Sequence, residues 1–155
     1  MFVGIDLDDN SYQVLTEIMM ILKMKKTLFS IMASLLIVGC TSKPVMNLND
    51  VYVPSTVTGQ QHSIDDVQTA ILTAAEQRGW SARVIKPGLI VATLSVRTHT
   101  ATVDIPYSAL SYSIDYKNSQ NLDYDGTDIH RNYNNWVVKL SRSIQQQLGV
   151  STQNY

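Results

Sequence analysis

The chain has 155 residues, of which 45% are hydrophobic and 16% are charged, a composition typical of one folded domain and not of a disordered tail. It carries 12 basic and 13 acidic side chains. The first 39 residues hold three of the basic and four of the acidic ones, so nine of each remain beyond them, and this even balance argues against nucleic-acid binding.

The first feature in chain order is a predicted export signal over residues 24–39. Met24, Lys25 and Lys26 supply a positive start, and an apolar stretch from Leu28 to Val38 follows. This layout is typical of a secretory signal peptide, and the stretch is shorter than the about 20 residues needed to cross a bilayer. Residues 1–23 contain four acidic side chains, which do not suit such a signal. We therefore interpret 1–23 as an extension ahead of a true start at Met24.

The signal ends in Ile37-Val38-Gly39-Cys40, which resembles the bacterial lipobox. The resemblance implies cleavage between Gly39 and Cys40, diacylglycerol on the Cys40 thiol and acylation of the new amine. We expect no cofactor besides this covalent lipid. Several acyl chains would then hold the protein stably on a lipid bilayer. Thr41 follows, where Asp would be similar to an inner-membrane retention signal, so the resemblance implies the outer membrane, facing the periplasm. The inner membrane is the alternative, and a buried cysteine at the end of a core helix is the structural alternative to lipidation.

Residues 40–62 are interpreted as the lipidated cysteine and a tether, residues 63–150 as a globular domain, and 151–155 as a tail. Within the tether, Asp50 to Val53 predicts a short edge strand that Pro54 ends. Ser63 and Asp66 form a capping box at the start of a helix over 63–78, which Gly79 ends. Apolar residues recur in it at helical spacing: Ile64, Val67, Ile71, Ala74 and Ala75.

Strict alternation between residues 80 and 117 predicts four strands with one buried and one wet face. The apolar set comprises Trp80, Ala82, Val84, Ile90, Ala92, Leu94, Val96, Ala101, Val103, Ile105, Tyr107, Leu110, Tyr112, Ile114 and Tyr116. The wet face carries polar residues that include Arg97, Asp104, Asp115 and Lys117. The links are short, with Pro87-Gly88 in a turn, so the strands are expected to pair as an antiparallel meander.

After a predicted polar loop over 118–128, a second helix is expected to begin near Ile129, with Asp128 or Thr127 as its cap and Gly149 at its end. Its apolar stripe comprises Ile129, Tyr133, Trp136, Val137, Leu140, Ile144 and Leu148. Laying both helices on the apolar sheet face predicts a two-layer α+β sandwich in the order α-β-β-β-β-α.

Several segments together with the lipobox resemble a family of small proteobacterial outer-membrane lipoproteins. They are Arg78-Gly79-Trp80, Pro87-Gly88-Leu89-Ile90, Val103-Asp104-Ile105-Pro106-Tyr107 and Ile129-His130-Arg131-Asn132-Tyr133. The resemblance covers nearly the whole chain from Met24. It implies the location and a small α+β domain, and it supplies no functional site.

Two groups of residues are candidates for metal or acid–base chemistry. Asn121, Asp123 and Asp125 precede a glycine as in the first half of a calcium loop, but Asn132 stands where the bidentate Glu belongs. A polar turn explains the same residues. His130 lies near Asp128, as an acid–base pair would require, and a half-buried packing histidine is the simpler interpretation. The scattered histidines favour no metal site.

We expect a non-enzymatic envelope module that binds an envelope protein or a small ligand. Tyr124, Asp128, His130 and Arg131 are the candidate binding residues, because loops on rigid scaffolds commonly carry function. The wet face around Arg97 and Asp115 is the next candidate. The alternative is a calcium-binding or hydrolytic protein that uses the segment 123–130. Convergent polar groups in a cleft there would favour the alternative, and an open sheet face would favour the binding module.

Overall fold

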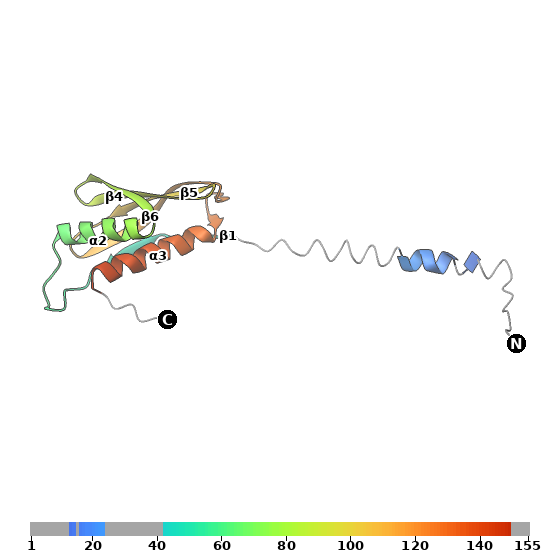
Figure 1. The fold of residues 1–155 in the computed structure, drawn as a ribbon, viewed down its shortest axis with the longest axis horizontal. Helices are drawn as coiled ribbons and strands as arrows, with labels where there is room; N and C mark the ends of the chain where they lie inside the picture. Colours follow the sequence, from blue (N-terminus) through green and yellow to red (C-terminus); the bar gives the residue numbers. More distant parts are fainter. Residues whose placement is uncertain (1–12, 15, 24–41, 150–155) are drawn as a thin grey trace. The chain divides into compact units, whose positions relative to one another are not determined.

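The computed structural model describes residues 13–14, 16–23 and 42–149 (Figure 1). Residues 13–14 and 16–23 are helical and belong to a unit separate from the domain. The expected signal peptide with Gly39 and Cys40 lies outside the described residues, as does the tail. No helix in the described part of the chain is both long and apolar enough to cross a membrane.

The domain is an α+β fold with two antiparallel sheets and two helices. Its elements are β1 (Ser42–Pro44), β2 (Leu48–Tyr52), α2 (Ile64–Gln77), β3 (Trp80–Lys86), β4 (Leu89–Val96), β5 (His99–Pro106), β6 (Ser111–Gln120), β7 (Asp128–His130) and α3 (Asn132–Gln147). The large sheet has the order β2-β6-β5-β4-β3, and β1 pairs with β7 in a separate two-stranded sheet. The two helices lie side by side on one face of the large sheet (Figure 1). The predicted four-strand meander is therefore part of a larger arrangement, with β2 added beside β6.

The core lies between the helices and the inner sheet face, where the predicted alternation is confirmed. Inward residues of the central strands are fully buried, among them Ile90, Val103 and Ile105. Three members of the apolar set are exposed instead: Val84 on the outermost strand, Val96 at the end of β4, and Leu110 before β6. Position at an edge or a turn removes the neighbours that would bury them.

The capping box at the start of α2 is confirmed in both directions. Ser63 Oγ accepts a hydrogen bond from the Asp66 backbone N–H at 3.1 Å, and Asp66 Oδ2 accepts one from the Ser63 N–H at 2.9 Å. The Ser63 hydroxyl also donates to Asp66 Oδ2 at 2.7 Å, and this bond together with that from the Ser63 N–H holds the pKa of the Asp66 carboxyl below its usual value. Arg78 occupies the C-cap, and Gly79 follows with a φ of 76°, a conformation that glycine adopts at little cost.

The interpretation of residues 40–62 as a tether is wrong for the part that the structure describes. β1 pairs with β7, and β2 pairs with β6 at the edge of the large sheet, where the edge strand predicted at Asp50 lies. The folded domain therefore begins at or before Ser42 and not at residue 63. Four partly buried side chains of this segment pack against the core: Val45, Met46, Leu48 and Val51. Their irregular spacing carries no periodic signal, which is why the sequence suggested a tether.

The predicted start of the last helix is also wrong. Ile129 lies in β7, opposite Lys43 of β1, and α3 begins three residues later at Asn132. Neither Asp128 nor Thr127 caps the helix: Arg131 occupies the N-cap position and makes no side-chain capping bond. Ile129 is fully buried, as a helical stripe would require, so periodicity alone could not separate the two conformations. In α3 itself, Trp136 is only partly buried.

β6 continues three residues beyond the end that the alternation predicted, and it contains a bulge. Val103 pairs with Tyr116 and Thr102 with Asn118, which leaves Lys117 as the extra residue. The residues from Asn118 to Gln120 were expected in a polar loop and belong to the strand. Beyond the bulge the alternation is displaced by one residue, and the Tyr116 and Ser119 hydroxyls lie 2.9 Å apart.

Candidate functional site

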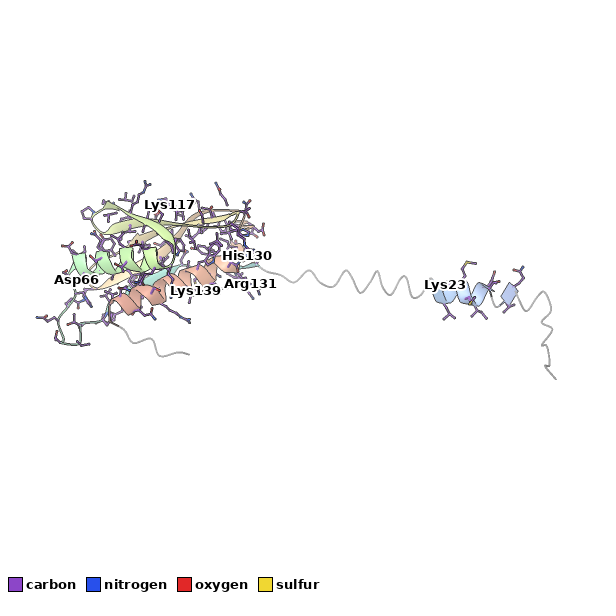
Figure 2. The ribbon with its side chains drawn as sticks, in the orientation of Figure 1. Lys23, Asp66, Lys117, His130, Arg131 and Lys139 are labelled. Atoms are coloured by element: carbon purple, nitrogen blue, oxygen red, sulfur yellow. The ribbon has the colours of Figure 1, made fainter. Side chains whose placement is uncertain are left out.

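The candidate binding residues lie at one end of the domain, in the loop before β7, on β7 and at the N-cap of α3. Figure 2 shows His130 and Arg131 at the end opposite Asp66, which marks the start of α2. Tyr124 and Arg131 are exposed, whereas Asp128 and His130 are partly buried. The structure therefore brings these four residues to one region of the surface.

Asn121 and Asp125, two of the candidate metal ligands, are engaged in shaping the loop. Asn121 has a φ of 55°, and its Nδ2 donates to the backbone oxygen of Thr98 at 2.6 Å. Asp125 Oδ1 accepts hydrogen bonds from the N–H groups of Thr127 and Asp128 at 2.9 and 2.7 Å. These two bonds lower the pKa of the Asp125 carboxyl. Within the described residues, no three His, Cys, Asp or Glu side chains are grouped closely enough to hold a metal ion.

His130 packs against another histidine. Its ring stacks on His99 with the ring centres 6.0 Å apart, and its Nδ1 accepts a hydrogen bond from the Asn132 N–H at 3.2 Å. His99 Nδ1 in turn contacts the backbone oxygen of Asn121. Among the described residues, no hydrogen bond or ion pair joins His130 to Asp128. The arrangement links β5, the loop and the start of α3.

Tyr124 joins the loop to the core through an aromatic cluster. Its ring lies 4.4 Å from that of Tyr116, which meets Tyr133 edge-on at 5.4 Å. The Tyr124 hydroxyl donates to the backbone oxygen of Gly126 at 3.0 Å. Below it, the Tyr133 hydroxyl is buried without a hydrogen-bond partner, and this burial, together with nearby Tyr116 and Asp115, raises the pKa of Tyr133. Tyr124 therefore has a packing role whether or not it also binds a ligand.

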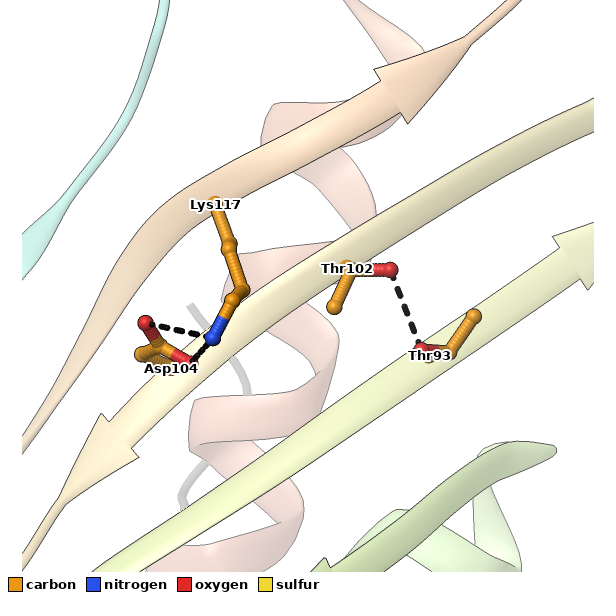
Figure 3. Close-up of polar contacts among 4 residues, drawn as sticks. All are labelled: Thr93, Thr102, Asp104 and Lys117. Atoms are coloured by element: carbon orange, nitrogen blue, oxygen red, sulfur yellow. Dashed lines mark hydrogen bonds and ion pairs between the residues drawn. The ribbon is translucent and has the colours of Figure 1, made fainter.

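The opposite, outer face of the large sheet is left uncovered by the helices and carries a shallow hollow of about 590 Å³. Its lining comes from four strands: Ser81, Arg83, Ile85, Leu89, Val91, Thr93, Thr102, Lys117 and Asn118. Figure 3 shows polar contacts on this face: the Thr93 and Thr102 hydroxyls lie 3.0 Å apart, and Lys117 Nζ contacts Asp104 at 2.8 and 3.2 Å. Arg83 makes no hydrogen bond or ion pair with any described residue.

Three acidic side chains, one each on β2, β5 and β6, influence one another's protonation. Partial burial raises the pKa of Asp115, and the neighbouring carboxylates of Asp104 and Asp50 raise it further. The negative charge of Asp104 is offset by its ion pair with Lys117, the extra residue of the β6 bulge. Asp104 and Lys117, both expected on the wet face, therefore form an ion pair across the neighbouring strands β5 and β6.

The sequence did not single out the hollow, although a signal was present. Ile85, Leu89 and Val91 are apolar side chains that line the otherwise polar outer face. A run of apolar side chains on a wet face is what a binding surface requires, and the two neighbouring strands bring these three together.

The fold and this site define a small α+β domain with one helix-covered and one open sheet face. No family model, curated protein or solved structure matches the chain.

Proposed function

We propose that the chain is a lipid-anchored protein of the bacterial envelope whose domain binds a partner through the outer face of the large sheet. The observation that carries this proposal is the hollow beside Arg83 on a sheet face that the chain's own helices leave open. Desolvated apolar area next to an uncompensated cation gives a partner both binding energy and orientation. The alternative metal or hydrolytic site receives less support, because Asn121 and Asp125 already bond to the loop backbone.

The position of β1 supports a close attachment to the membrane. Cys40 precedes Ser42 by two residues, and two residues of chain reach about 7 Å at most. Ser42 pairs with His130 across the small sheet. Lipid on Cys40 would therefore hold the end with His130 and Arg131 against the head groups. The outer sheet face is then the surface that stays available to a partner in the periplasm.

Lipidation is tested by replacing Cys40 with Ser. We expect loss of palmitate labelling and accumulation of an uncut precursor, because the thioether needs the thiol. A mature product of normal mobility would contradict the anchor.

Binding through the outer face is tested by complementation of a deletion strain. We expect the Arg83→Glu variant to fail to restore the wild-type envelope phenotype to the deletion strain, because the substitution reverses the charge beside the hollow. Arg142→Glu is the matched control, since Arg142 is an exposed arginine of α3 on the helix layer. Both variants should melt like the parent chain and accumulate equally. Full restoration by Arg83→Glu would rule out the outer face as the binding surface.

A further inference from the structure

We propose that the free edge of β3 binds an extended, acidic segment of a partner protein, which adds to the large sheet as a sixth strand. This inference rests on the proposed function, because it names the partner that the outer face would receive. A sheet edge offers a row of unpaired backbone groups, and strand addition is a common mode of peptide recognition.

β3 is the last strand of the sheet, and its outer side has no described partner. Among the described residues, its seven residues pair only with β4, and none from Trp80 to Lys86 makes a backbone hydrogen bond outside that ladder. In an antiparallel pair, every second residue points its N–H and C=O away from the neighbour. Val84 and Ile85 add apolar surface there, with 41% and 48% of their area exposed.

The edge at β2 is closed to such pairing by several features. β2 has five residues, its register shifts between Leu48 and Val51, and Asp50 has a φ of 49° with its N–H bonded to Ser113 Oγ. Pro54 follows the strand. β3 also has a register shift, but it lies between Val84 and Lys86, so the five residues from Trp80 remain regular. The β3 edge is therefore the one that accepts another strand.

The positive charge of β3 indicates what kind of partner strand it would bind. β3 carries Arg83 and Lys86 and no acidic residue, and neither cation is paired with a described residue. An acidic side chain opposite Arg83 would form a cross-strand pair of opposite charge, and an apolar side chain beside it would lie against the hollow near Ile85. A second copy paired through its own β3 would bring four cations together without an acid. The geometry thus favours a different, acidic partner.

Hydrogen exchange on the full chain, purified in mild detergent as the cell produces it, tests the proposal. The probe is a capped synthetic peptide of three Val-Glu repeats, and its charge-inverted control has three Val-Lys repeats. We expect the Val-Glu peptide to slow amide exchange in residues 80–86 and to leave residues 48–52 unchanged. The double variant Arg83→Glu, Lys86→Glu should bind this peptide about tenfold more weakly and prefer Val-Lys. Arg142→Glu should behave as the parent chain.

Three results would overturn the inference: no protection of residues 80–86, equal protection by both peptides, or protection that rises with protein concentration alone, which would indicate a second copy. The complementation test separates this failure from failure of the proposed function. If Arg83→Glu still abolishes complementation while neither peptide protects β3, the outer face binds a partner by another mode, and only the strand addition is wrong.

Discussion

At the scale of single residues, two buried tyrosines show that a buried hydroxyl can stabilise or destabilise the folded chain. The Tyr112 hydroxyl lies 2.8 Å from Ser141 Oγ, whereas the Tyr133 hydroxyl has no partner among the described residues. An unpartnered buried hydroxyl costs about 1–3 kcal/mol in lost solvation, and a satisfied one contributes about 1 kcal/mol. The hydroxyls of these two buried side chains therefore contribute to stability with opposite signs.

We expect Tyr133→Phe to leave the free energy of unfolding unchanged or to raise it by about 1 kcal/mol, because it removes the unpartnered group. Tyr112→Phe is the matched control and should lower it by about 1 kcal/mol, because Ser141 loses its partner. Urea unfolding at neutral pH measures both. A clear loss of stability in Tyr133→Phe would show that its hydroxyl has a partner, such as an ordered water.

The same tyrosines predict how stability depends on alkaline pH. Burial raises the pKa of both Tyr112 and Tyr133 in the folded chain. Above the ordinary tyrosine pKa of about 10, the unfolded chain loses these protons first, so stability falls as the pH rises. Between pH 8 and pH 11, the free energy of unfolding should therefore fall less for Tyr133→Phe than for the parent chain. An equal fall in both proteins would show that groups other than Tyr133 cause the loss of stability in alkali.

At the scale of elements, the start of α2 depends on its capping box. We expect Ser63→Ala to lower the free energy of unfolding by about 1 kcal/mol, because the Asp66 N–H loses its acceptor. The Ser63 bonds lower the pKa of Asp66 in the folded chain. Their contribution to stability is therefore fully present above the pKa that Asp66 has in the unfolded chain, and it is lost as the pH falls through the lower pKa of the folded chain. The difference between variant and parent should therefore shrink in acid. Ser95→Ala, on the exposed outer face, is the control.

β1 and β2 belong to the domain and do not serve as a tether. We expect removal of residues 42–52 to lower the free energy of unfolding by roughly 3 kcal/mol or more, because Val45, Met46, Leu48 and Val51 leave the core. Ile129 also loses its strand partner Lys43. Denaturation of chains that begin at residue 42 and at residue 53 compares the two. Equal stability would restore the domain boundary near residue 63.

At the scale of the whole molecule, the proposed anchor fixes which end of the domain faces the lipid. A fluorophore on Arg131→Cys should be quenched strongly by a quencher-labelled lipid, and one on Asp65→Cys, at the start of α2 beside Asp66, only weakly. Insertion of a flexible linker of about 20 residues before Ser42 should abolish the difference, because a linker of that reach lets the domain turn freely relative to the membrane. Equal quenching of the two sites in the parent chain would contradict the orientation.

The sequence by itself determined the elements whose signals are local. The capping box and Gly79 bounded α2, and strict alternation identified the inward faces of β4, β5 and β6. These signals work because hydrogen bonds at a helix end and side-chain burial on a pleated strand depend on residues within a few positions of one another.

Only the tertiary structure decided the features that depend on distant partners. Ile129 is buried in either a helix or a strand, and its pairing with Lys43, 86 residues away, settles the conformation. The irregular apolar residues of 45–51 become part of the core only because β2 docks beside β6. The hollow likewise exists because four strands, with the β6 bulge at Lys117, bring their side chains to one face. Register between strands is set by long-range packing, which no local pattern encodes.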